Sequence, residues 1–246
     1  MEVIRSKSNN LIKQIKKLQQ KKYRRSSYLI EGWHLLEEAL AAGARIEHIL
    51  VVEEHVDRVA QLEKVTVVSP EIMQDLADSK SPQGVVAQLA LPSQQLPDQL
   101  AGKFLVLEDV QDPGNVGTII RTADAAGFDG VFLTHKSADM YNMKVLRSMQ
   151  GSHFHLPIYR LPIGDIFSTL KHHQVEILAT TLSSQSVDYR QVAPGASFAL
   201  VMGNEGQGIS DFVAEEANQL VHITMPGQAE SLNVAIAAGI LVFSFI

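Results

Sequence analysis

Residues 198–208, FALVMGNEGQG, indicate the fold class most directly, because five apolar residues run directly into a polar turn with three glycines. Such an uninterrupted apolar run is typical of a strand buried on both faces, as in a parallel sheet covered by helices. Similar apolar runs occupy residues 104–107, 130–133 and 175–180. We therefore predict an α/β fold in which residues 103–246 build a mostly parallel sheet.

Three polar, glycine-bearing segments follow predicted strands in this part of the chain, at residues 108–127, 202–210 and 223–239. In parallel sheets, ligands bind beyond the carboxyl ends of the strands. The three segments are therefore candidates for one shared site. Each segment taken alone is also explained as a helix cap, a turn or tight packing.

The first segment leads from a Pro-Gly turn into a predicted helix. Asn115 stands where the cap of this helix is expected. Thr118 and Arg121 follow at helical spacing, so all three side chains can face one cleft. Gly127 is expected to end the helix in the left-handed conformation.

The second segment excludes two common nucleotide sites. Its glycine spacing is Gly-x-x-Gly-x-Gly rather than the dinucleotide pattern Gly-x-Gly-x-x-Gly, and no Gly-Lys-Ser/Thr follows, as a phosphate loop requires. The carboxylate of Glu205 would repel a polyphosphate. The segment suits an uncharged or cationic ligand better, and the sulfonium of S-adenosylmethionine meets that requirement.

The third segment opens an apolar helix of small residues with Ser231 and Asn233. Free backbone amides and short polar side chains at a helix start can hold a ligand. Residues 235–239 are small enough for another backbone to approach closely. A helix cap followed by a tightly packed helix explains the same residues without a ligand.

The amino-terminal part alternates short β-type runs with helical patterns, which predicts a small α/β domain over residues 1–90. A linker at residues 91–102, which contains two prolines, separates it from the domain of residues 103–246. The predicted helices are at about 10–25, 33–40 and 71–76, and the predicted strands are at 28–30, 48–52, 65–68 and 84–89.

The first 25 residues carry nine basic side chains and one acidic side chain, although the whole chain has a net charge of −6. A local cluster of lysine and arginine can hold an RNA backbone even on an acidic protein. The alternative is a solvated helix face. The residues expected to contact RNA are Lys13, Lys16, Lys17, Lys21, Lys22, Arg24 and Arg25.

Several classes of protein are disfavoured. The chain has no cysteine, and its first residues lack the apolar core of a secretion signal, so we expect a cytoplasmic protein. The apolar run at residues 232–246 has 15 positions, whereas a bilayer span needs roughly 17–25. It is expected to be a buried helix or a subunit interface, with no membrane role. The histidine pairs 153/155 and 172/173 lack metal-ligand spacing, and we expect no metal.

Together, in order and spacing, the three segments resemble the SpoU family of RNA ribose 2′-O-methyltransferases, in the SPOUT superfamily of knotted methyltransferases. This resemblance extends from about residue 104 to residue 242. Residues 28–32 and 35–39 resemble the ribosomal-protein-like RNA-binding domain that accompanies many members. The resemblance implies S-adenosylmethionine-dependent 2′-O-methylation of a structured RNA, with ribosomal RNA favoured. A transfer RNA substrate and a non-catalytic rRNA-binding protein are the alternatives.

The resemblance also implies a trefoil knot in residues 103–246 and a homodimer to which the final helix contributes. It assigns the catalytic group to Arg121, Asn115, Glu205, Ser231 and Asn233. It assigns cofactor contacts, largely through the backbone, to Thr181, Leu182, Gly203, Ile223, Met225 and Leu232. Because a guanidinium has a pKa above about 12, we assign Arg121 to positioning the ribose-phosphate and stabilising negative charge, not to removing a proton.

Overall fold

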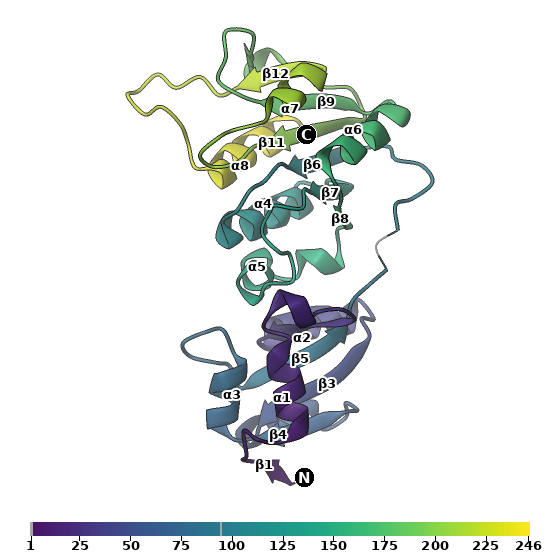
Figure 1. Cartoon of the computed structure of the whole chain (residues 1–246), viewed down its shortest axis with the longest axis vertical. Helices are drawn as coiled ribbons and strands as arrows, with labels where there is room; N and C mark the ends of the chain where they lie inside the picture. The colour runs from purple at the N-terminus through teal and green to yellow at the C-terminus, as the bar shows by residue number, and fades with distance from the viewer. Residues whose placement is uncertain (1, 94) are drawn as a thin grey trace. The chain divides into compact units, whose positions relative to one another are not determined.

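The chain forms two units in the computed structural model, which describes residues 2–93 and 95–246 (Figure 1). Unit 1 consists of Met1–Ser93 and Asp139–Phe154, and unit 2 consists of Gln94–Ala138 and His155–Ile246. The sequence analysis assigns residues 139–154 to the carboxy-terminal domain, but they pack with unit 1. The division into domains at residues 1–90 and 103–246, with a linker at 91–102, stays a prediction.

A mixed sheet of five strands forms the centre of unit 1. β5 runs antiparallel to both of its neighbours, whereas β1, β4 and β3 run parallel. The four strands predicted here are confirmed, and the short β1 was not predicted. The strands lie in the order β1 (Val3–Ile4), β4 (Val65–Val68), β3 (Ile46–Val52), β5 (Val85–Ala90) and β2 (Ser27–Glu31).

Helices pack on this sheet through apolar side chains such as Ile12, Ile15 and Ile72, which are buried together with Leu50 of β3. The helices of unit 1 are α1 (Asn10–Lys17), α2 (Trp33–Ala41), α3 (Pro70–Leu76) and α5 (Met143–Met149), with 3-10 turns η1 (Lys21–Tyr23), η2 (Glu53–Val59) and η3 (Ser152–Phe154).

The basic helix α1 is shorter than predicted, and its extension to residue 25 is wrong. It ends at Lys17. Arg24 Nη1 donates to the carbonyl oxygens of Leu18 at 2.8 Å and Gln19 at 3.0 Å. In a longer helix these carbonyls would accept from the amides of the next turn. The Arg24 guanidinium donates to these carbonyl oxygens in place of the amides of that turn.

Unit 2 is built on a sheet of seven strands, each parallel to its neighbours. The predicted parallel sheet is confirmed, whereas the short strands β8, β10 and β12 were not predicted. The order is β10 (Val187–Asp188), β12 (Gln219–His222), β9 (Glu176–Thr180), β11 (Phe198–Met202), β6 (Lys103–Leu107), β7 (Gly130–Leu133) and β8 (Ile158–Arg160).

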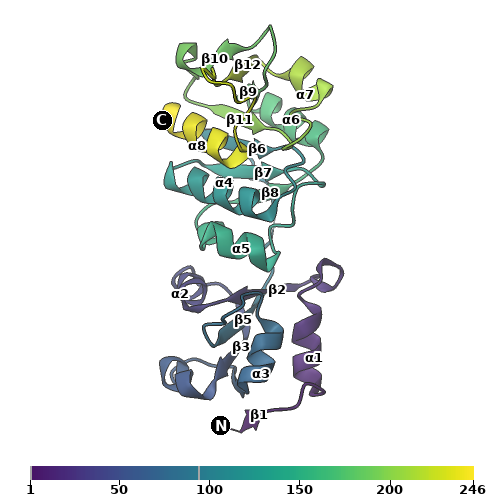
Figure 2. The ribbon, with the colours of Figure 1, turned by 90° about the vertical axis from the view of Figure 1, so that its left-hand side faces the viewer.

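Helices cover both faces of this sheet, which explains why every residue of β11 is buried. In Figure 2, α4 (Pro113–Ala125) and α8 (Val234–Ser244) lie on one face, and α6 (Ile163–His172) and α7 (Asp211–Glu216) lie on the other. A further 3-10 turn, η4, spans Tyr189–Gln191. No helix within the described residues is long and apolar enough to cross a membrane.

Candidate active site and RNA interface

The carboxyl ends of β12, β9, β11 and β6 meet at one edge of the sheet in unit 2, because these strands are parallel neighbours. Thr181, Gly203 and Ile223 directly follow β9, β11 and β12. Thr181 N donates to Val221 O at 3.0 Å and extends the pairing of β9 with β12 by one residue. Three of the positions expected to contact the cofactor therefore start from the same edge.

The other expected cofactor positions lie in the segments that leave this edge. Leu182 is 61% exposed and Leu232 is 37% exposed, and Met225 is half-buried. Apolar side chains that are this exposed can cover the flat face of a ligand, since most ligand sites are lined by apolar groups.

The segments that follow β9, β11 and β12 suit a cationic ligand. Residues 181–186, 203–210 and 223–233 contain no lysine or arginine. Glu205, in the second of them, would repel a polyphosphate and attract a positive sulfur. The residues present therefore fit S-adenosylmethionine, with backbone groups and exposed leucines to hold it and no lysine or arginine in these segments to repel its positive sulfur.

The glycines of the second segment build a tight turn. Asn204 N donates to Gly208 O and Gly208 N to Asn204 O, each at 2.9 Å. A Cβ on Gly203 would lie 2.3 Å from the carbonyl carbon of Gly208, so only glycine fits. The resemblance assigns Gly203 to the cofactor, and within the protein the backbone that approaches Gly203 is that of its own turn.

Asn204 ties this turn to the loop after β6, a role that the sequence analysis missed. Its Oδ1 accepts from Gly206 N at 2.9 Å and Gln207 N at 3.0 Å. Its Nδ2 donates to Asp109 O at 2.8 Å. An asparagine two residues before a glycine is a recognisable turn signal, but only the fold shows the contact with Asp109.

Glu205 stands at the tip of the turn and binds the first segment. Its carboxylate accepts from Gln111 N at 3.1 Å, Asp112 N at 3.0 Å and Asn115 Nδ2 at 3.1 Å. Burial acts to raise the pKa of Glu205, but the hydrogen bonds outweigh it and hold the pKa below its ordinary value. Glu205 is therefore a carboxylate that orients its neighbours at neutral pH.

Asn115 is not the cap of α4, so that prediction is wrong. The helix begins at Pro113, and the side chain of Asp112 accepts from Asn115 N at 2.9 Å. Proline suits the first turn of a helix and aspartate suits the cap, which moves the start of α4 to an earlier residue. The Asn115 side chain is thereby left to bind Glu205.

The predicted left-handed Gly127 after this helix is confirmed, with φ at +67°.

Asn233 joins the third segment to the other two. It caps α8, since its Oδ1 accepts from Ala235 N at 2.9 Å and Ile236 N at 3.3 Å. Its Nδ2 donates to Asn115 Oδ1 at 3.0 Å. One hydrogen-bonded chain thus links Glu205, Asn115 and Asn233, one residue from each segment that the sequence analysis grouped.

Arg121 and Ser231 are not part of this series of hydrogen bonds. Arg121 lies six residues after Asn115 on α4 and its side chain is exposed. Ser231 lies in the exposed segment between β12 and α8. Within residues 2–93 and 95–246, neither side chain forms a hydrogen bond or an ion pair, so both are available to a substrate.

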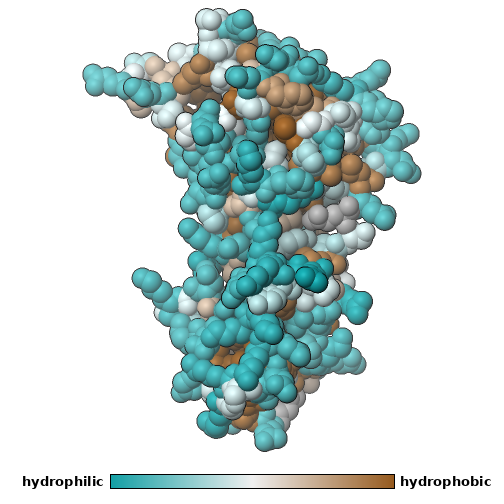
Figure 3. Space-filling view, in the orientation of Figure 1, coloured by the Kyte–Doolittle hydropathy of each residue, from teal (hydrophilic) through white to brown (hydrophobic). Residues whose placement is uncertain are grey.

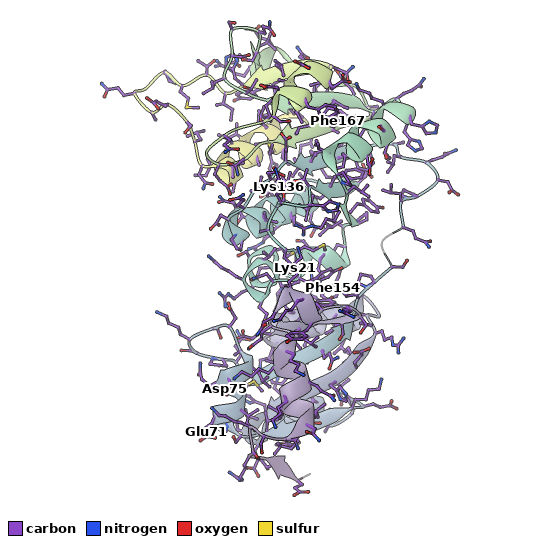
Figure 4. All side chains as sticks on the ribbon, in the orientation of Figure 1. Lys21, Glu71, Asp75, Lys136, Phe154 and Phe167 are labelled. Atoms are coloured by element: carbon purple, nitrogen blue, oxygen red, sulfur yellow. The ribbon has the colours of Figure 1, made fainter. Side chains whose placement is uncertain are left out.

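Asp109, which receives the Asn204 side chain, is held in an unusual conformation. Its φ is +55°, in the left-handed region that aspartate tolerates better than most residues. Thr134 Oγ1 donates to Asp109 Oδ1 at 2.6 Å and accepts from Asp109 N at 2.8 Å. Lys136, labelled in Figure 4, pairs with Asp109 Oδ2 at 3.3 Å. These contacts place the loop that carries Gln111 and Asp112 toward Glu205.

Asp188 holds the start of the third segment in a comparable way. It accepts from Arg190 Nε at 2.7 Å and Arg190 Nη2 at 2.8 Å, and also from the Thr224 hydroxyl. These hydrogen bonds, that from Arg190 above all, hold the pKa of Asp188 far below its ordinary value. Thr224 stands between Ile223 and Met225, so Asp188 places two of the expected cofactor positions.

Most of the predicted RNA contacts lie on the surface of unit 1. Lys13, Lys16, Lys17, Lys21, Lys22 and Arg25 are exposed. Arg24 differs, because its side chain is only 4% exposed and pairs with Asp139. Its guanidinium binds Leu18 O, Gln19 O and Asp139 inside unit 1, so Arg24 is not part of the exposed basic surface.

Three of the histidines noted in the sequence lie beside an aspartate or beside each other. His155 Nδ1 lies 3.1 Å from Asp124 Oδ2, and the rings of His172 and His173 are 4.9 Å apart. Among the residues that the structure describes, no three His, Asp or Glu side chains are placed to hold a metal ion.

Residues 102–243 match the SpoU rRNA Methylase family, and residues 9–87 match the MRM3-like substrate binding domain. The chain belongs to the SpoU rRNA methylase family. The SpoU resemblance and the resemblance of the amino-terminal part to a substrate-binding domain are both confirmed.

This SpoU family member is similar to known methyltransferases over nearly its whole length. It is 41% identical to the 23S rRNA (guanosine(2553)-2′-O)-methyltransferase RlmP of Bacillus subtilis, over 99% of this chain and 98% of RlmP. An AdoMet-bound rRNA methyltransferase from Sinorhizobium meliloti has a TM-score of 0.89 and 34% identity, covering 98% of this chain and 96% of the other. The AdoMet complex of the SpoU methyltransferase AviRb from Streptomyces viridochromogenes has a TM-score of 0.87 and 25% identity, covering 96% of each chain. The predicted α/β fold class is therefore confirmed.

Proposed function

We propose that this chain methylates a ribose 2′-hydroxyl of ribosomal RNA in the cytoplasm, where that RNA is found. The predicted enzyme class and cofactor are confirmed by membership of a methylase family and by relatives with AdoMet bound. Ribosomal RNA is favoured over transfer RNA because RlmP, which matches both units, is named for 23S rRNA. The hydrogen-bonded chain of Glu205, Asn115 and Asn233 carries the proposal, because it assembles one site from all three segments.

The residues of this site have separate tasks in the proposed reaction. S-adenosylmethionine, when bound, supplies a methyl group activated by positively charged sulfur. The exposed guanidinium of Arg121 binds the ribose-phosphate and stabilises negative charge that develops on the 2′-oxygen. Asn115 and Asn233, fixed by their mutual hydrogen bond, present polar groups to the ribose, and Ser231 offers a hydroxyl. Glu205 orients Asn115 and the loop after β6, because its low pKa makes it a weak proton acceptor.

We also propose that two copies associate through α8. Ile236 and Phe243 are 57% and 53% exposed, and Ile246 just beyond the helix is 57% exposed. Ile236 and Phe243 are seven residues apart and so lie on nearly the same side of the helix. An exposed apolar patch of this kind marks an interaction surface. Light scattering should give a dimer for the natural chain and a monomer for Phe243→Asp.

The trefoil knot implied by the resemblance is likewise a proposal. It is supported by the parallel sheet of unit 2 and by the long segment at residues 223–233, which carries the chain from β12 to α8 beside α4. Tracing the chain in an electron-density map of the crystallised protein would test it.

The substrate assignment is tested by mapping 2′-O-methylation in total RNA from cells with and without this protein. One ribosomal RNA nucleotide should lose its methyl group in the deletion strain and regain it when the natural gene, but not Arg121→Ala, is restored. A site lost only from transfer RNA would overturn the choice of ribosomal RNA. An unchanged methylation map, with no transfer in vitro, would favour a non-catalytic RNA-binding protein.

A further inference from the structure

Tyr23 is an exposed aromatic side chain near the end of the basic segment, residues 1–25. It is 42% exposed and is the most exposed of the five tyrosines. Within residues 2–93 and 95–246 its ring stacks on no other aromatic ring. The core of unit 1 therefore does not explain why an aromatic residue stands here.

Two lysines lie close to this ring. The ammonium groups of Lys22 and Lys17 are 5.0 Å and 5.7 Å from the ring centroid. Lys21, labelled in Figure 4, belongs to the same 3-10 turn as Tyr23. In Figure 3, hydrophilic side chains cover most of the visible face of unit 1. Two positively charged groups thus lie within 6 Å of the exposed Tyr23 ring.

The backbone around Tyr23 is held in place by Arg24. The Arg24 guanidinium is buried, donates to Leu18 O and Gln19 O, and pairs with Asp139. Tyr23 N donates to Gln20 O at 3.1 Å. Because the backbone is fixed before any ligand binds, an aromatic ring here would lose little freedom on binding.

The chemistry of this surface fits an unpaired RNA nucleotide. Bases that are not paired stack on exposed tyrosine rings, and lysines beside the ring can bind the flanking phosphates. Two acidic partners of the basic segment are already paired, Asp75 with Lys7 and Lys16 and Asp139 with Arg24. An acidic peptide would pair with the lysines but would offer the aromatic ring no stacking partner.

We propose that Tyr23 stacks on an unpaired base of the RNA substrate while Lys17 and Lys22 bind the phosphates on either side of it. This inference rests on the proposed function, since it assumes an RNA substrate. It adds a recognition site in unit 1 for a single-stranded part of that RNA.

Binding of the full chain to two fluorescent probes tests the proposal, one a single-stranded RNA of mixed sequence and the other a duplex of the same length. Tyr23→Ala should bind the single strand about tenfold more weakly and the duplex as the natural chain does. Tyr23→Phe should restore single-strand binding, because the ring remains. The salt dependence should be unchanged in Tyr23→Ala and weaker in a Lys17→Ala, Lys22→Ala variant.

A tryptophan at this position gives a direct measure of stacking. The emission of Tyr23→Trp should be quenched by the single strand, and the natural chain, whose only tryptophan is Trp33, is the control. Equal affinity of Tyr23→Ala and the natural chain for the single strand, with no quenching, would overturn the stacking proposal alone. Failure of the natural chain to bind either probe would instead contradict the RNA-binding function.

Discussion

Glu205 and Asn115 are 90 residues apart in the sequence, yet a hydrogen bond of 3.1 Å joins Asn115 Nδ2 to Glu205 Oε1. This contact connects the turn after β11 to the first turn of α4. Asn115 also accepts from Asn233. A substitution at any of these three residues should therefore alter the hydrogen bonds of the other two.

Arg121→Ala should abolish methyl transfer without unfolding the protein. Arg121 is exposed, and among the described residues its side chain has no hydrogen bond or ion pair, so the circular dichroism spectrum and the melting temperature should hardly change. Loss of a group that stabilises developing charge typically lowers kcat by about 100-fold or more. Calorimetry should show unchanged binding of S-adenosylmethionine. Turnover like that of the natural chain would refute the role given to Arg121.

Glu205→Gln should lower kcat, because a neutral amide holds the backbone amides of Gln111 and Asp112 less strongly than a carboxylate does. The pKa of Glu205 is lowered in the folded state, so its contribution is present above the ordinary value of 4.5 and is lost only as the pH falls below it. Activity limited by Glu205 should therefore be constant from pH 7 to about pH 5. Glu230→Gln, an exposed glutamate of the third segment, is the control, and an equal loss in both variants would count against this role.

Asn204→Ala should loosen the turn that presents Glu205. It removes the acceptor for Gly206 N and Gln207 N and the donor to Asp109 O. The expected cost is about 1 kcal/mol in the free energy of unfolding, measured by urea denaturation, with a larger fall in kcat than in the affinity for RNA. Gln207→Ala removes a neighbouring side chain of the same turn and should change neither quantity. If both variants behave alike, Asn204 has no special part in placing Glu205.

Arg24→Ala should destabilise unit 1 strongly. Its guanidinium is 4% exposed and pairs with Asp139, so removing it leaves a largely buried carboxylate without its partner. Breaking such a pair costs about 3–5 kcal/mol, which thermal or urea unfolding would detect. The neighbouring Arg25 is exposed, and Arg25→Ala should have little effect on stability. Similar stabilities for the two variants would contradict the structural role of Arg24.

The exposed lysines should govern the salt dependence of RNA binding. Replacing Lys16, Lys17, Lys21 and Lys22 with alanine should reduce the slope of log K against log salt by about 0.7–0.9 for each phosphate that is no longer neutralised. Fluorescence titrations at several salt concentrations would measure this slope. Lys103→Ala, at the start of β6 in unit 2, should leave it unchanged. A slope that stays the same in the fourfold variant would show that the lysines of α1 and η1 are only solvated surface charges.

The sequence predicted the long strands well because their signal is local. The apolar run at residues 198–202 is β11 itself, and Asn233 is the expected cap of the last helix. The short strands β8, β10 and β12 were missed because none of them has more than two apolar residues, whereas the equally short β4 and β7 have three. The cap of α4 was misplaced because Asp112 and Asn115 are both good capping residues, and only the position of Pro113 separates them.

The local sequence accounts for the β11 strand and the glycine turn after it, because the apolar run and the close backbone approach at Gly203 involve only neighbouring residues. It could not determine which strands lie side by side. The order β12, β9, β11, β6 is a tertiary choice, and it sets the turn of Glu205 beside Asn115. The end of α1 at Lys17 was decided in the same way, by a buried arginine whose partner, Asp139, is 115 residues away. Contacts over such separations depend on how whole elements pack, and no local pattern records them.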